Sequence, residues 1–125
     1  MIVSREAFRD LVREAVELLP TELRREVKNV DLVIEDRPTQ EDLEVAGLEP
    51  GHTLLGLYHG VPLPFRGHES YNLVLPDKIS IYQEPIESVC RNKDEIVEQV
   101  RITVLHELAH YFGIDDDRLH ELGMG

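Results

Sequence analysis

The sequence predicts an α+β fold in which a small mixed or antiparallel sheet packs against a long helix and an N-terminal helix. Three features predict it: apolar residues at helical spacing near the start, short apolar runs divided by glycine and proline in the middle, and a capped helical pattern near the end. With 125 residues, the chain has the length of one compact domain, and we expect residues 1–125 to form it.

The composition argues against several classes of partner. The chain has 13 Lys and Arg against 25 Asp and Glu, a net charge of −12, which repels nucleic-acid phosphates and anionic lipid surfaces. No run approaches the roughly 18 apolar residues of a transmembrane helix. Charged residues follow Met1 almost at once, so we expect no secretory leader, and the single Cys90 cannot form an internal disulfide. We therefore expect a cytoplasmic protein without nucleic-acid or membrane partners.

Two helices are expected first. The first runs from about Ser4, a potential N-cap, to Leu19, and Pro20 stops it. Its apolar residues recur at helical spacing: Phe8, Leu11, Val12, Ala15, Val16 and Leu19. Thr21 is suited to cap a second, short helix that ends near Lys28.

Short strands and turns are expected next. The apolar run from Val30 to Glu35 predicts a strand, and Thr39 is suited to open a turn or two of helix before Gly47. Seven glycines and prolines then divide the chain between Pro50 and Pro85. They favour a loop over residues 61–69 and strands near Thr53–His59, Tyr71–Leu75 and Lys78–Gln83.

A long helix is expected from Asn92 to Gly113. Asn92 with Glu95 three residues later is typical of a helix start, and Gly113 is suited to the residue after a helix end. Apolar residues cover most of the circumference, which predicts a centrally buried helix. One polar stripe interrupts them, formed by Gln99, Thr103, His106 and His110 with Glu107 at its edge.

This stripe contains the pattern His-Glu-x-x-His. His106 and His110 are four residues apart, so both imidazoles project from one side of the helix and can bind one Zn²⁺ ion. Glu107 projects beside that ion, where it can act as the general base toward metal-bound water. The alternative is that both histidines pack among polar neighbours and Glu107 forms a buried ion pair.

A third ligand is expected just after the helix. Gly113 permits the left-handed conformation that turns the chain back, and Asp115-Asp116-Asp117 follow. The extended string resembles the metzincin zinc signature with Asp116 in place of its usual third histidine. Two His and one Asp would leave one position for water. Asp115, Asp117 and His120 are rival ligands, and capping of a last helix is the other role open to Asp116.

More closely, the chain resembles the minimal zincin family of small bacterial metallopeptidases. The resemblance implies a zincin-like α+β fold, a zinc site on the long helix, a cleft between helix and sheet, and peptidase activity. The only methionine available for the Met-containing turn of true metzincins is Met124, which we do not assign that role. The matching segments are the N-terminal helix, Ile34-Glu35-Asp36, Leu55-Gly56-Leu57-Tyr58, residues 75–82 and Thr103-Val104-Leu105-His106-Glu107.

The leading hypothesis is therefore a zinc metallopeptidase acting on a peptide or protein substrate. An edge strand over Lys78–Gln83 would align that peptide through backbone hydrogen bonds. A non-catalytic, zinc-stabilised interaction module is the alternative, because 125 residues leave little material for a deep cleft. The His-x3-His-x5-Asp spacing also resembles a bacterial RNA-processing hydrolase family, but that family lacks the equivalent of Glu107, and the net charge disfavours RNA.

The remaining polar and aromatic candidates receive structural expectations. Tyr82 and Tyr111 are expected to pack in the core, although either could donate to a tetrahedral intermediate, and Cys90 is expected to be a small buried residue. Three histidines of the middle segment are expected to be solvated: His52, His59 and His68.

Overall fold

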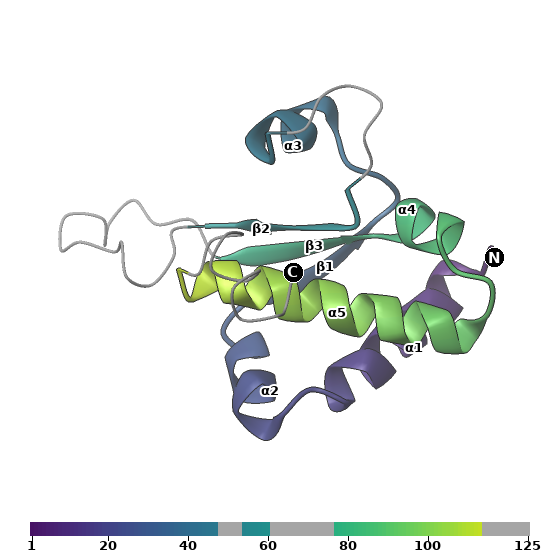
Figure 1. Ribbon diagram of the computed structural model, residues 1–125, viewed down its shortest axis with the longest axis horizontal. Helices are drawn as coiled ribbons and strands as arrows, with labels where there is room; N and C mark the ends of the chain where they lie inside the picture. The colour runs from purple at the N-terminus through teal and green to yellow at the C-terminus, as the bar shows by residue number, and fades with distance from the viewer. Residues whose placement is uncertain (48–53, 61–76, 114–125) are drawn as a thin grey trace, which may run out of the picture.

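The structure of the protein is a computed structural model that describes residues 1–47, 54–60 and 77–113 (Figure 1). The predicted α+β class is confirmed. The expected strand near Tyr71–Leu75 and the loop over residues 61–69 lie outside the described residues. The elements are α1 (Arg5–Glu17), α2 (Thr21–Val27), β1 (Asp31–Glu35), α3 (Gln40–Val45), β2 (Gly56–His59), β3 (Lys78–Tyr82), α4 (Gln83–Ser88) and α5 (Lys93–Tyr111).

The helix starts follow the expected capping residues with one exception. Ser4 accepts the backbone N–H of Ala7 at α1, and Asn92 accepts that of Glu95 at α5. Thr39 forms a complete capping box with Asp42 at α3. The exception is α2, where Pro20 and not Thr21 is the N-cap. The fixed φ of proline suits this position, and the Pro20 carbonyl accepts the first helical N–H groups.

The sheet is mixed and has the strand order β1-β3-β2 within the described residues. β1 pairs with β3 in parallel and β2 pairs with β3 antiparallel. The expectation that Lys78–Gln83 forms an edge strand is therefore wrong. β3 is the central strand and buries residues from both faces, including Ser80 and Tyr82 as well as two isoleucines. Among the described strands, β2 is the edge strand that makes the closest packing with α5.

The short helix α4 was not expected from the sequence. It starts at Gln83, directly after β3, so the strand ends one residue earlier than predicted. A proline usually interrupts a helix or strand. Pro85, however, lies in the first turn of α4, where the absence of an N–H costs no helical hydrogen bond.

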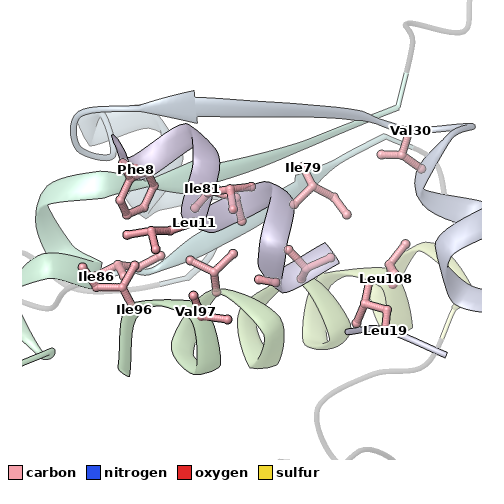
Figure 2. Close-up of a cluster of buried hydrophobic side chains, with 14 of the residues drawn as sticks. Phe8, Leu11, Leu19, Val30, Ile79, Ile81, Ile86, Ile96, Val97 and Leu108 are labelled. Atoms are coloured by element: carbon pink, nitrogen blue, oxygen red, sulfur yellow. The ribbon is translucent and has the colours of Figure 1, made fainter. Parts of the chain in front are cut away.

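The core lies between the sheet and the packed helices α1 and α5 (Figure 2). Ile79 and Ile81 of β3 project from the sheet toward these helices, whereas α3 lies on the other side of the sheet (Figure 1). Cys90 is buried at the margin of this core, as expected. The largest fully buried side chains of this core are Phe8, Ile79, Ile81, Ile86, Ile96 and Leu108. Burying each contributes about 1.5–3 kcal/mol of transfer free energy.

The long helix α5 is buried around most of its circumference, as predicted. Its buried residues are Ile96, Val97, Val100, Thr103, Val104, Glu107, Leu108, Ala109 and Tyr111. Beyond its end, Gly113 adopts a φ of 83°, the left-handed conformation expected there. None of the described helices combines the length and apolar content needed to cross a lipid bilayer. The helix α5 therefore has fixed contacts on most sides, and it carries the polar residues His106, Glu107 and His110.

Candidate metal centre

The last two turns of α5 bring His106, Glu107 and His110 together. One potential ligand atom from each lies within 4.8 Å of the others. The two imidazole rings meet edge to face, with centroids 4.8 Å apart. In a tetrahedral zinc site with bonds of about 2.0–2.1 Å, donor atoms lie about 3.4 Å apart, so the two imidazoles have a separation close to that of two zinc ligands, with Glu107 beside them. The donor types and their spacing therefore fit Zn²⁺.

Glu107 is held by the neighbouring strand. Its side chain is buried, with 6% of the residue exposed, and its Oε1 accepts the backbone N–H of Tyr58 at 2.8 Å. Oε1 also lies 3.4 Å from Nδ1 of His110, which is long for a hydrogen bond. A buried carboxylate is costly unless it is hydrogen-bonded, so the bond from β2 offsets part of that cost and fixes the direction of the carboxylate.

A close approach between β2 and α5 makes that bond possible. A Cβ atom at Gly56 would lie 2.5 Å from Cγ2 of Thr103 and 3.0 Å from the carbonyl oxygen of Ser80. Glycine inside a strand is typical of such close backbone approaches. The hydroxyl of Thr103 donates to the Gln99 carbonyl at 2.8 Å, and its methyl group packs toward Gly56. Thr103, which the sequence places on the polar stripe, is thus a packing residue.

The side chain of Tyr58 is fixed at both its ring and its hydroxyl. The hydroxyl donates to Oδ1 of the buried Asp77 at 3.1 Å, and the ring meets Tyr111 edge to face at 5.8 Å. Sequence reasoning did not assign Tyr58 to the site because it acts there through its backbone N–H, a group carried by every residue except proline. A glycine within a predicted strand opposite the helix is the signal that could have indicated the contact.

Tyr82 and Tyr111, the other aromatic candidates, pack in the interior as expected. The hydroxyl of Tyr82 donates to Oδ2 of Asp42 at 2.9 Å, and burial followed by this carboxylate raises the pKa of Tyr82. Burial alone raises the pKa of Asp42, but hydrogen bonds from the Thr39 N–H and Tyr82 outweigh it and lower the pKa overall. The expectation that His59 is solvated is wrong: His59 is half-buried at the end of β2, and its Nε2 atom is buried.

Several predicted residues lie outside the part of the chain that the structure describes. They are the proposed third ligand Asp116, its rivals Asp115, Asp117 and His120, and also His52, His68 and Met124. The positive φ of Gly113 supplies the change of chain direction that a ligand at Asp116 requires. The assignment of Asp116 stays a prediction.

Two adjoining hollows open onto the cluster. The first, of about 250 Å³, extends along Gln99, Ile102 and Thr103 of α5, and we call it the Ile102 hollow. The second, of about 370 Å³, extends toward Val45 at the end of α3, and we call it the Val45 hollow. His106 and Glu107 line both. A larger hollow of about 550 Å³ lies between α1 and β1 and contains none of the three cluster residues.

Comparison with known proteins identifies the family. The model of the zincin-like metallopeptidase family matches residues 27–125. This range includes the His106–His110 cluster and the strands β2 and β3, which pack against α5. The chain belongs to the zincin-like metallopeptidase family. No curated protein matches the sequence significantly.

A solved structure shares the fold. A conserved hypothetical protein from Thermus thermophilus is 25% identical, with a TM-score of 0.54, and the match covers 96% of this chain and 97% of that one. The similarity therefore extends over the whole zincin-like fold, but the description of that protein assigns it no activity.

Proposed function

We propose that this zincin-like protein is a zinc-dependent peptidase that hydrolyses peptide bonds in a peptide or protein substrate. The observation that supports this most directly is the position of Glu107. Its carboxylate is buried, is held by the Tyr58 N–H, and lies beside two imidazoles one helical turn apart. A purely structural metal site needs no such carboxylate, because structural zinc sites are closed by their own ligands.

We assign the zinc ligands to His106, His110 and Asp116. When bound, the ion would polarise the scissile carbonyl and lower the pKa of a coordinated water molecule. Both imidazoles are half-buried and line the Val45 hollow, so a substrate in that hollow could reach them. Asp116 would complete the three protein ligands typical of catalytic zinc and would leave one position open.

Glu107 would act as the general base and then as the general acid. It would take a proton from the attacking water and deliver it to the amine that leaves. The Tyr58 N–H donates to Oε1 and so holds the carboxylate in one orientation before substrate arrives. Such preorganisation is worth most in a buried site, where water cannot compete for the same hydrogen bond.

The edge strand β2 would position the substrate. Backbone groups of alternate β2 residues point away from β3, and because Glu107 takes the Tyr58 N–H, a peptide would pair with the other outward-pointing backbone groups of this edge. An extended peptide lying along this edge would pass directly over the cluster on α5. This assignment replaces β3, which is central in the sheet and offers no free edge.

The test combines metal analysis with peptide hydrolysis. We expect protein purified without chelators to hold about one zinc per chain and His106→Ala to lose it. Glu107→Gln should retain zinc but lower kcat about 10²- to 10⁴-fold on a mixed peptide library. Glu98→Gln is the matched control, because Glu98 lies on the exposed face of α5, where it pairs with Arg101.

The outcomes separate the hypotheses. If Glu107→Gln and wild type hydrolyse peptides equally at equal zinc content, the assigned base is wrong. If wild type holds zinc and cleaves nothing, while chelation lowers its stability, the chain is a zinc-stabilised module and not an enzyme. Asp116→Asn compared with Asp115→Asn and Asp117→Asn identifies the third ligand, since only one of the three should lower zinc affinity strongly.

A further inference from the structure

The Ile102 and Val45 hollows together form the cleft beside the cluster, and their other walls are uncharged. Although 30% of the residues in the chain are charged, no described residue lining the Ile102 or Val45 hollow is an acid or a base except the cluster itself. These described wall residues are Leu54, Leu55, Gly56, Gln99, Ile102 and Thr103 in the first hollow, and Val45, Ala46, Leu54, Gly56, Leu57 and Tyr58 in the second. Because the chain as a whole is strongly acidic, these uncharged walls indicate that the two hollows bind apolar groups.

Each hollow also carries an exposed aliphatic side chain. Ile102 of α5 is 42% exposed and Val45 of α3 is 65% exposed. Single exposed aliphatic residues are common on protein surfaces, but these two come from different elements and border hollows that share His106 and Glu107. They therefore place exposed apolar surface beside the cluster.

The hydroxyl groups of the walls are hydrogen-bonded within the protein, and the uncharged side-chain amide of Gln99 is the other polar side-chain group of these walls. In the Ile102 hollow, the Thr103 hydroxyl donates to the Gln99 carbonyl. In the Val45 hollow, the Tyr58 hydroxyl donates to Asp77 and its backbone N–H donates to Glu107. A charged side chain entering either hollow would lose water and gain few partners in return, whereas an aliphatic one would gain contacts.

The two hollows extend to opposite sides of the cluster along α5. The first uses residues that precede His106, whereas the second includes His110. One helical turn advances about 5.4 Å, and an extended peptide advances about 3.3 Å per residue. If the scissile peptide bond lies at Glu107, substrate side chains one or two residues before it would reach one hollow, and those one or two residues after it would reach the other.

We propose that the cleft selects substrates with aliphatic, uncharged side chains on both sides of the bond that is hydrolysed, with Ile102 and Val45 as specificity-determining residues. This inference rests on the proposed peptidase function, but it concerns binding, which can be measured without hydrolysis.

The experiment uses zinc-loaded Glu107→Gln protein and fluorescein-labelled extended peptides that differ only in their central pair. Fluorescence anisotropy measures Kd for central Leu-Leu, Asp-Asp and Lys-Lys. We expect Leu-Leu to bind about tenfold more tightly than either charged pair, because only leucine gains free energy by leaving water for these walls. Equal binding of the three, tighter binding of a charged pair, or no binding of any overturns the inference.

Charge variants assign the effect to the two hollows. In the Glu107→Gln background, Ile102→Lys and Val45→Lys should each weaken Leu-Leu binding and improve Asp-Asp binding several-fold. Val89→Lys is the matched control, because Val89 is 52% exposed and lines neither hollow, and the added charge is the same. If Val89→Lys shifts the preference as much as the other two, the hollows do not set specificity. Hydrolysis by wild type is measured separately, so an inactive wild type with intact Leu-Leu preference rejects the peptidase but keeps the binding preference.

Discussion

Replacing Gly56 by alanine should disrupt the candidate site from outside the cluster. The new Cβ would lie 2.5 Å from Cγ2 of Thr103 and 3.0 Å from the Ser80 carbonyl oxygen. Carbon atoms in contact prefer about 3.5–4.0 Å, so β2 and α5 must separate by roughly 1 Å. The Ser80 oxygen is backbone of the central strand and cannot move aside, so the adjustment falls on β2.

The separation weakens the bond that holds Glu107. The Tyr58 N–H to Oε1 distance of 2.8 Å would grow past about 3.5 Å, where no useful hydrogen bond remains. Overpacking costs about 1–3 kcal/mol and loss of a hydrogen bond to a charged group about 1.5–3 kcal/mol. We therefore expect the free energy of unfolding to fall by about 2.5–6 kcal/mol, with a lower kcat for peptide hydrolysis.

The assays are urea unfolding, zinc content and peptide hydrolysis of Gly56→Ala. Thr103→Ser provides a rescue, because serine keeps the hydroxyl that donates to Gln99 and removes the methyl group that the new Cβ would meet. The double variant should recover part of both stability and kcat, a coupling that a double-mutant cycle measures. Gly47→Ala is the control: Gly47 has a positive φ of 74° but no atoms near its Cβ position, so it should lose about 1 kcal/mol and no activity.

Two results would refute this reasoning. Wild-type stability and kcat in Gly56→Ala would show that β2 and α5 are not in tight contact. Loss of activity that Thr103→Ser does not relieve at all would show that the defect arises elsewhere than at this contact.

The remaining predictions concern stability, acid sensitivity, thiol reactivity and metal removal. Tyr58→Phe should lose about 1–3 kcal/mol in urea unfolding with unchanged zinc content, because buried Asp77 loses a donor; an unchanged unfolding midpoint contradicts this. The pKa of Asp42 is lower in the folded than in the unfolded protein. Its contribution to the free energy of unfolding is therefore complete above the unfolded pKa of about 3.9 and is lost as the pH falls through the folded pKa. Asp42→Asn should remove this part of the pH dependence of stability. Burial raises the pKa of the Cys90 thiol, so it should react with a thiol reagent at pH 8 far more slowly in native than in urea-unfolded protein. Chelation should lower the Tm of wild type but leave His106→Ala unchanged.

The helices that carry the site were predictable because their signals are local. Ser4 and Asn92 cap α1 and α5 as expected, and the left-handed Gly113 follows α5. The four-residue spacing of His106 and His110 alone places both on one side of a helix, and the structure brings them together with Glu107.

Strand order and backbone contacts were not predictable in the same way. Whether β3 is central or at an edge depends on pairing between segments far apart in sequence, so the expectation of an edge strand there had no local signal to test it. The contribution of Tyr58 depends on the approach of β2 to α5, which only the small size of Gly56 hints at. α4 was missed because Pro85 suggests a break although it lies in a first turn.

The anchoring of Glu107 by a strand ties chemical competence to the completion of folding. An isolated α5 segment could present two imidazoles to an ion, but its carboxylate would rotate freely. Only when Tyr58 lies opposite Ile79 does its N–H point outward to the helix, and a slip of one residue would turn that N–H toward β3. A partly folded chain would therefore hold the two imidazoles without an oriented carboxylate beside them until β2 has paired with β3 in the correct register.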